Sequence, residues 1–193
     1  MRGRPAIFED TDIIKKAQKV FWEKGYSATS LSDLQKATGA GAGSFYNTFK
    51  GGKKEVFQKA IAERRQAFNA FKMELNNSET PLALIKDFFR SIALADENEH
   101  LRGCIIANTV VEMTFIDEKL EGDAVKILKE VEEMFTKAIT NEQKKGKLKT
   151  TMAPEILGRY LITFWCGLNT LRRMYPNKAI LKTQIEMQLA VIS

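Results

Sequence analysis

The chain contains few residues at the spacing that catalysis or nucleotide binding requires. The glycine-rich stretch 39–43 and the run Gly51-Gly52-Lys53-Lys54 both suggest a loop that cradles phosphate. A P-loop needs a glycine where Asn47 stands and a serine or threonine where Lys54 stands, so the spacing does not fit. No Ser-His-Asp order, Cys-His pair or pair of acids stands out either. The sequence therefore predicts a protein that is not an enzyme and that binds no cofactor.

Residues that could bind a metal are equally sparse. The only histidine, His100, follows an acidic stretch at 96–99. A zinc site takes three or four imidazole or thiolate ligands, and this chain has few to give, so we expect His100 to lie exposed between two helices. Cys104 and Cys166 stand in apolar surroundings without CxxC spacing, which predicts buried thiols rather than a disulfide or a metal site.

Basic charge is concentrated in the first third of the chain. Residues 1 to 65 contain 13 Lys and Arg against 7 Asp and Glu, whereas residues 66 to 193 contain 17 of each. A localised basic surface attracts nucleic-acid phosphates because binding releases condensed counterions. A solvated surface without a partner would account for the same excess, so charge alone leaves both interpretations open.

Composition and hydropathy indicate a soluble, folded protein. Hydrophobic residues make up 44% of the 193 residues and charged residues 28%, which is ordinary globular composition. No run of about 18 apolar residues appears, and no apolar stretch follows the first charged residues. We therefore expect a cytoplasmic protein that does not bind membranes.

Apolar residues recur at spacings of three and four almost throughout, which predicts an all-α fold of about nine helices. The first predicted helix ends at Gly25, and Ser30 with Asp33 begins the second at capping-box spacing. Gly39 ends this second helix, and a third short helix follows from Ala42 to Thr48. Later helices are predicted at 53–75, 81–95, 102–115, 119–145, 154–175 and 178–192. Two short helices joined by a glycine turn after a longer helix are the outline of a helix-turn-helix.

Many residues in the first sixty positions follow an order known from one protein family. They are Gly3-Arg4-Pro5, Ala17, Phe21, Gly25-Tyr26, Thr29-Ser30-Leu31, Leu34, Gly39, Gly43-Ser44-Phe45-Tyr46, Phe49, Lys53 and Val56-Phe57. This order resembles the N-terminal signature of TetR-family transcriptional regulators, of the TetR/AcrR type. The stretch 103–109 with Glu112 is also similar to one branch of that family.

The resemblance implies which residues bind double-stranded DNA. The segment from Ala42 to Thr48 would lie in the major groove, and Tyr46 would hold a phosphate. Thr29 and Ser30 would offer donors to phosphate at the start of the second helix. Arg4 would reach the adjacent minor groove. The expected DNA-binding residues are Arg4, Thr29, Ser30, Gly41, Ala42, Ser44, Tyr46, Asn47, Thr48, Lys53 and Lys54.

Two features depart from the family pattern. Gly41 and Ala42 stand where a polar or basic side chain is common, so base reading would fall to Ser44, Asn47 and Thr48, with methyl contacts from Ala42. The link to the fourth helix is one residue longer than usual, which makes either Lys53 or Lys54 the expected backbone contact.

The remaining helices are expected to bind an effector and to pair two copies of the chain. Asn108, Thr109 and Glu112 are polar among apolar neighbours, so they need partners if buried, either on a neighbouring helix or on a ligand. Most large aromatic residues here, Phe115 included, are expected in the core. The candidate effector residues are Phe89, Asn108, Thr109, Glu112, Phe164 and Trp165. The expected dimer interface, in the last two helices, comprises Leu157, Leu161, Phe164, Leu168, Leu171, Leu181, Ile185, Leu189 and Ile192.

These observations predict a helix-turn-helix DNA-binding domain at 1–55 and a helical effector-binding and dimerisation domain at 56–193. The predicted function is a ligand-responsive repressor that binds a near-palindromic operator as a homodimer, with an apolar or amphipathic effector. Two alternatives stay open. One is a dimeric DNA-binding protein without an effector, and the other is a helical enzyme or adaptor with a basic N-terminus.

Overall fold

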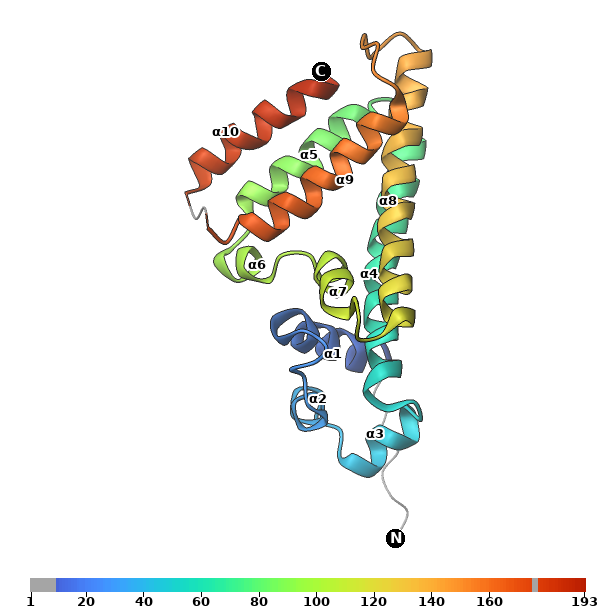
Figure 1. Ribbon diagram of the computed structural model, residues 1–193, viewed down its shortest axis with the longest axis vertical. Coiled ribbons are helices and arrows are strands. Elements are labelled where there is room, and N and C mark those ends of the chain that lie inside the picture. Colours follow the sequence, from blue (N-terminus) through green and yellow to red (C-terminus); the bar gives the residue numbers. More distant parts are fainter. Residues whose placement is uncertain (1–9, 175–176) are drawn as a thin grey trace.

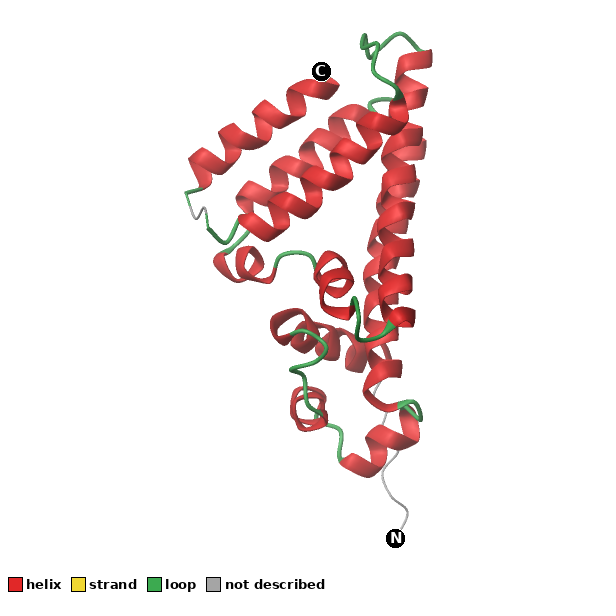
Figure 2. Ribbon diagram, viewed as in Figure 1, coloured by secondary structure: helices red, strands yellow, loops and turns green. Residues whose placement is uncertain are grey.

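The computed structural model of the chain describes residues 10–174 and 177–193. In these residues the chain forms α-helices and one 3-10 turn but no strand, which confirms the all-α prediction (Figure 2). The helices are α1 (Asp10–Lys24), α2 (Leu31–Thr38), α3 (Ala42–Thr48), α4 (Gly52–Asn77), α5 (Pro81–Leu94), α6 (Glu97–Arg102), α7 (Ile105–Met113), α8 (Glu118–Lys144), α9 (Pro154–Leu171) and α10 (Lys178–Leu189), with the 3-10 turn at Ala190–Ile192. Nine of these helices match predicted ones, and the addition is the six-residue α6.

The three N-terminal helices form a small unit at one end of the molecule (Figure 1). Helix α1 buries one face, which includes Ile13, Ile14 and Phe21. Gly25 ends α1 with a φ of +82°, a conformation in which a side chain would be strained. The ring of Phe57, from α4, packs edge-on against Phe21 with centroids 4.8 Å apart. This contact joins α1 to α4, whereas the short helices α2 and α3, which would not be stable alone, join the same core through the buried side chains of Leu34 and Phe45.

The long helix α4 connects this unit to the rest of the protein. It begins beside α3 and runs without a break along α8, with which it is in contact (Figure 1). The predicted domain boundary at residues 55 and 56 falls inside this helix and stays a prediction. Gln58 and Arg65 fasten α4 to α8 by hydrogen bonds to Asp123 and Glu130.

Helices α5, α8, α9 and α10 form the far end of the molecule. Phe89 of α5 stacks on Phe164 of α9 at 5.0 Å between ring centroids. Gly158 lets α9 approach α8 closely, because a Cβ atom there would meet the side chain of Thr136. Helix α10 lies across α5, to which Arg90 and Glu186 tie it by a two-pronged ion pair. Among the described helices, none combines the length and the apolar character needed to cross a membrane.

Candidate nucleic-acid interface and effector cleft

Helix α3 has the bounds predicted for the recognition helix, and its outer surface is open. Phe45 is fully buried, and its ring lies 5.3 Å from the ring of Phe49. The residues predicted to contact DNA from this helix lie on the opposite side, where Ala42, Ser44 and Asn47 are exposed. Tyr46 is 51% exposed, and Gly41 precedes the helix as an exposed N-cap. The hydroxyl of half-exposed Thr48 donates to the Ser44 carbonyl at 3.1 Å.

The start of α2 is a capping box, as the sequence predicted. The Asp33 backbone N–H donates to the Ser30 hydroxyl oxygen, and the Ser30 N–H donates to the Asp33 carboxylate at 2.9 Å. A hydrogen bond from Lys24, together with the bonds from Ser30, holds the pKa of Asp33 well below its usual range. Ser30 therefore uses its own donors inside the cap. The N–H groups of the next two residues are the donors that a helix N-terminus leaves for phosphate.

Thr29 was predicted to offer donors to DNA phosphate, but both of its donors are already used inside the protein. Thr29 is 1% exposed, and its hydroxyl donates to the Gly25 carbonyl at 2.6 Å. Its backbone N–H donates to the Tyr26 carbonyl. Thr29 closes the turn between α1 and α2 and has no group left for phosphate.

Lys53 and Lys54 have partners inside the protein, which changes the role expected for both. The Lys53 ammonium donates to the carbonyls of Tyr26 and Thr29 at 3.0 Å each and lies 4.4 Å from the centre of the Tyr26 ring. The Lys54 ammonium pairs with Asp117 at 2.5 Å and lowers the pKa of that carboxyl group. Neither ammonium group is therefore free to bind a DNA phosphate in this structure. Lys53 positions the turn before α2, and Lys54 joins α4 to the start of α8.

Two lysines that the sequence analysis did not select are better placed for phosphate. Lys36 on α2 and Lys50 after α3 are exposed, and neither has an ion-pair or hydrogen-bond partner within residues 10–174 and 177–193. The position of Lys50 directly after the recognition helix was the signal that could have identified it. Arg4, the predicted minor-groove contact, lies outside the described residues.

Glu112 connects the helix-turn-helix to the helical core. Its carboxylate accepts hydrogen bonds from the backbone N–H groups of Tyr26, at 2.9 Å, and Ser27, at 2.7 Å. Both donors lie in the turn that leads from α1 to α2. The sequence left open whether Glu112 bonds to a neighbouring helix or to a ligand, and the structure gives it a partner in the turn of the DNA-binding unit.

A cleft of about 1080 Å³ lies between that turn and helices α7, α8 and α9. Asn108, Thr109 and Glu112 line it, with an apolar wall that includes Leu128 and Ile162. The Thr109 hydroxyl donates to the Ile105 carbonyl, and the Asn108 amide donates to the Arg102 carbonyl. Three of the six predicted effector residues therefore share one cleft.

The other three candidate effector residues do not line this cleft. Phe89 is fully buried and packs between Phe135 and Phe164, so it belongs to the core. Trp165 is 6% exposed and lines a separate, smaller cavity. The expectation that Phe115 lies in the core is also wrong, because its side chain is fully exposed at a φ of +69°.

The predicted dimer residues are almost all buried within the protomer, which corrects the interface assignment. Phe164 is half-buried and packs on Phe89, whereas Leu171 is 44% exposed. The remaining seven are at most 5% exposed, so no surface remains for a partner, and they are Leu157, Leu161, Leu168, Leu181, Ile185, Leu189 and Ile192. The apolar side chains that do face outward on these two helices are Ile156, Leu171, Ile180 and Met187.

His100 is buried, contrary to the expectation that it lies exposed. It is 8% exposed, and neither ring nitrogen has a hydrogen-bond partner among the described residues. Burial, followed by the charges of Arg172 and Lys178, lowers the pKa of His100. Of the two free thiols, Cys104 is buried as predicted, whereas Cys166 is half-buried and burial raises its pKa to about 12.

Two family models match the chain in the order that the fold suggests. Residues 13–60 match the model of bacterial regulatory proteins of the tetR family. Residues 81–187 match the C-terminal domain of tetracyclin repressor-like proteins. The first model covers the helix-turn-helix, and the second covers more than half of the chain.

Curated relatives agree with these models. The HTH-type transcriptional repressor DhaR of Mycobacterium sp. (strain GP1) is 27% identical over 160 residues, which cover 80% of this chain and 77% of that repressor. The HTH-type transcriptional regulator YezE of Bacillus subtilis (strain 168) is 26% identical and covers 98% of this chain and 99% of its own. Among solved structures, a cysteine mutant of the TetR-family regulator CifR, in complex with operator DNA, superposes with a TM-score of 0.80 at 22% identity, covering 99% of this chain and 100% of that one. From its helix-turn-helix, its helical core and these matches, we conclude that the chain belongs to the TetR family of DNA-binding transcriptional regulators.

Proposed function

We propose that the chain is a ligand-responsive repressor that binds a near-palindromic operator as a homodimer. The observation that carries the proposal is the surface of α3, whose outward side is polar and exposed, whereas Phe45 and Phe49 are fully buried on the inner side. Ser44, Asn47 and Thr48 would read base edges, and Ala42 would contact thymine methyl groups. Tyr46, Lys36 and Lys50 would bind phosphates on either side. DhaR is a repressor, and CifR was solved with its operator, which supports the same action here.

A binding experiment tests this assignment. Duplexes selected from random DNA provide the operator, and fluorescence anisotropy measures its affinity. Asn47→Ala should lower the affinity by about 1–3 kcal/mol and relax the preference at one base position. Asn76→Ala, an exposed asparagine at the far end of α4, is the matched control and should bind as the wild type does. Equal affinities of the two variants for the selected operator would contradict the role of α3.

The outward faces of α9 and α10 are the proposed dimer surface. Ile156 on α9 is exposed, as are Ile180 and Met187 on α10. Burying such a face against a second copy removes apolar surface from water. Met187→Lys should shift the protein toward the monomer in sedimentation, whereas Met73→Lys, equally exposed on α4, should not. A wild-type protein that sediments as a monomer at all concentrations would rule out this arrangement.

The cleft beside α7 is the proposed effector site. It touches the turn before α2 and the core helices at once, so a ligand there can favour one relative position of the two units. Its apolar wall suits an apolar or amphipathic effector. A shift from 1:99 to 99:1 between two states needs about 5.5 kcal/mol of differential binding. A DNA-binding dimer without an effector is the alternative, but a cleft of about 1080 Å³ in the protomer favours the responsive form.

A further inference from the structure

A second cavity lies next to the cleft and shares part of its wall. It has a volume of about 300 Å³ and is lined mainly by residues of α1, α4, α5, α6 and α9. Trp22 and Arg102 line both this cavity and the larger cleft, so they form a shared wall. Both tryptophans of the chain, Trp22 and Trp165, line the smaller cavity. Below, this space is called the arginine cavity.

The arginine cavity has an excess of positive charge. Its charged lining residues are Arg64, Arg102 and Arg172 against the single carboxylate of Glu99. None of these arginines forms an ion pair with any residue in the described part of the chain. Backbone carbonyls accept hydrogen bonds from two of them, that of Asn98 from Arg102 and those of Glu99 and Gly103 from Arg172. These carbonyls carry no net charge, whereas buried charges are normally paired with an opposite charge.

Arg64 illustrates this imbalance. Its guanidinium lies over the rings of Trp22 and Phe68, with its central carbon 5.1 Å and 5.3 Å from their centres. Burial lowers the pKa of Arg64, and nearby groups compensate only in part. Aromatic faces attract the cation, but they accept no directional hydrogen bond as a carboxylate would.

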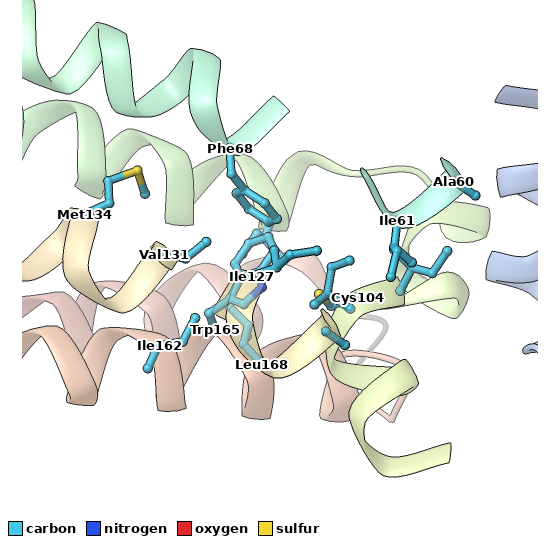
Figure 3. Packing of buried hydrophobic residues seen from close by; sticks show 14 of the residues in the cluster. Ala60, Ile61, Phe68, Cys104, Ile127, Val131, Met134, Ile162, Trp165 and Leu168 are labelled. Atoms are coloured by element: carbon cyan, nitrogen blue, oxygen red, sulfur yellow. The ribbon is translucent and has the colours of Figure 1, made fainter. Parts of the chain in front are cut away.

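Three residues around the arginine cavity also carry buried donors without an acceptor. They are the Nε atoms of Arg64 and Arg172 and the indole Nε1 of Trp165, which have no hydrogen-bond partner among the described residues. Arg172 and Trp165 are 7% and 6% exposed. In Figure 3 Trp165 lies beneath Phe68, among apolar side chains of α4, α8 and α9. Leaving a buried donor unpaired costs about 1–3 kcal/mol, so such groups are rare in native structures, and a bound acceptor is one way to satisfy them.

We propose that the arginine cavity binds a small organic carboxylate. A carboxylate supplies acceptors only, matches the planar guanidinium groups after a small rotation of these side chains, and lowers the excess of two positive charges in the lining to one. Phe88, Ile92 and Trp165 provide apolar contacts for a short hydrocarbon or aromatic body. The proposal names a ligand class for the effector response proposed above. Binding of the carboxylate does not depend on that response, but its effect on DNA binding rests on the proposed function.

The cavity is also placed to affect the DNA-binding unit. The Trp22 indole N–H donates to the Gly103 carbonyl at 3.1 Å, and the Trp22 ring is stacked by Arg64 and Arg102. Trp22 belongs to α1, so a carboxylate that draws Arg64 away from this ring changes a contact between α1 and the core. The expected consequence is a change in operator affinity when the carboxylate binds.

Intrinsic fluorescence and calorimetry test the binding. The probes are benzoate and butyrate, their neutral counterparts benzamide and butyramide, and inorganic phosphate. Benzoate or butyrate should change the tryptophan emission of the wild-type dimer saturably, with an affinity at least about tenfold higher than that of the matching amide. Equal affinity for acid and amide, tighter binding of phosphate, or no saturation by either acid up to about 10 mM would overturn the proposal, since even a site with a Kd of about 1 mM would be mostly filled at that concentration.

Matched variants locate the site. Arg64→Gln should weaken carboxylate binding by about tenfold or more in calorimetry, and Trp165→Phe, which removes only the indole donor and some ring area, should weaken it less. Arg65→Gln removes the same charge one residue later, where Arg65 pairs with Glu130 outside the cavity, and should bind as the wild type does. Equal affinities in the Arg64 and Arg65 variants would refute the assignment.

The regulatory consequence has a separate readout. Carboxylate binding that leaves operator affinity unchanged would support the site but contradict effector control through it. An operator affinity that responds to apolar compounds, in a protein that binds no carboxylate, would support the proposed function and overturn this inference.

Discussion

Replacing Glu112 by glutamine should loosen the connection between α7 and the helix-turn-helix. The Glu112 carboxylate accepts two N–H groups, from Tyr26 and Ser27, at 2.9 Å and 2.7 Å. A hydrogen bond to a charged group contributes about 1.5–3 kcal/mol, and less where water can replace it, as at this half-exposed site. Glutamine keeps one neutral oxygen acceptor, but its NH₂ group faces the second N–H and cannot accept a hydrogen bond from it. We therefore expect a loss of about 2 kcal/mol in the free energy of unfolding.

Thermal and urea denaturation measure this loss, which for a chain of this size lowers Tm by about 4–8 °C. Operator affinity should also fall, by up to about tenfold, because the turn before α2 is no longer fixed in advance of binding. Glu132→Gln is the matched control, since Glu132 lines the same cleft but pairs with Arg159, on α9. If both variants lost the same stability and kept wild-type operator affinity, the reasoning that Glu112 couples the two units would be refuted.

Three further changes test other parts of the molecule. Lys50→Ala should weaken binding to all duplexes alike and reduce the slope of log affinity against log salt by about 1, as measured by anisotropy at several salt concentrations. The pKa of His100 is lowered in the folded protein, so below about pH 6.5 the unfolded chain binds more protons, and the free energy of unfolding should fall by at most about 1.36 kcal/mol per pH unit as the pH drops. Urea melts between pH 5 and 7 should show a smaller pH dependence of stability for His100→Asn. The same pH dependence in the variant and the wild type would assign the effect to another group. Gly158→Ala should destabilise the protein by about 1–3 kcal/mol, because the added Cβ would collide with Thr136. Gly122→Ala on α8, where the added Cβ meets no other atom, should stabilise it by up to about 1 kcal/mol. Equal urea midpoints for the two variants would contradict this account.

Local features of the fold could be predicted from the sequence because they depend on neighbouring residues. The bounds of α3, the cap formed by Ser30 and Asp33, and the end of α1 at Gly25 all follow from short-range patterns. Helix α6 was missed because six residues show no periodicity, although Asp96 and Glu99 form a capping box that could have revealed it.

Contacts between distant residues could not be predicted in the same way. The partners of Lys53 and Lys54 are 24 to 63 residues away, so nothing near either lysine indicates that its charge is already engaged. The leucines of α9 and α10 have the spacing of a buried face, but this spacing is the same for burial in the protomer and against a second copy. The charge of the arginine cavity also arises only in the fold, because Arg64 and Arg172 meet there from α4 and from the residue that follows α9.

The unbroken course of α4 limits how this regulator can be recombined with its relatives. The helix has 26 residues and is therefore about 39 Å long, with no hinge between the end that carries Lys53 and the end that packs on α5. A chimera that joins this core to the DNA-binding domain of a relative must keep the helical phase of α4 across the junction. One inserted residue would rotate the DNA-binding domain by about 100° and advance it by about 1.5 Å, so in the proposed homodimer the two recognition helices would no longer face successive major grooves. Exchange of this domain should thus succeed only with junctions aligned residue by residue, whatever the similarity of the parent sequences.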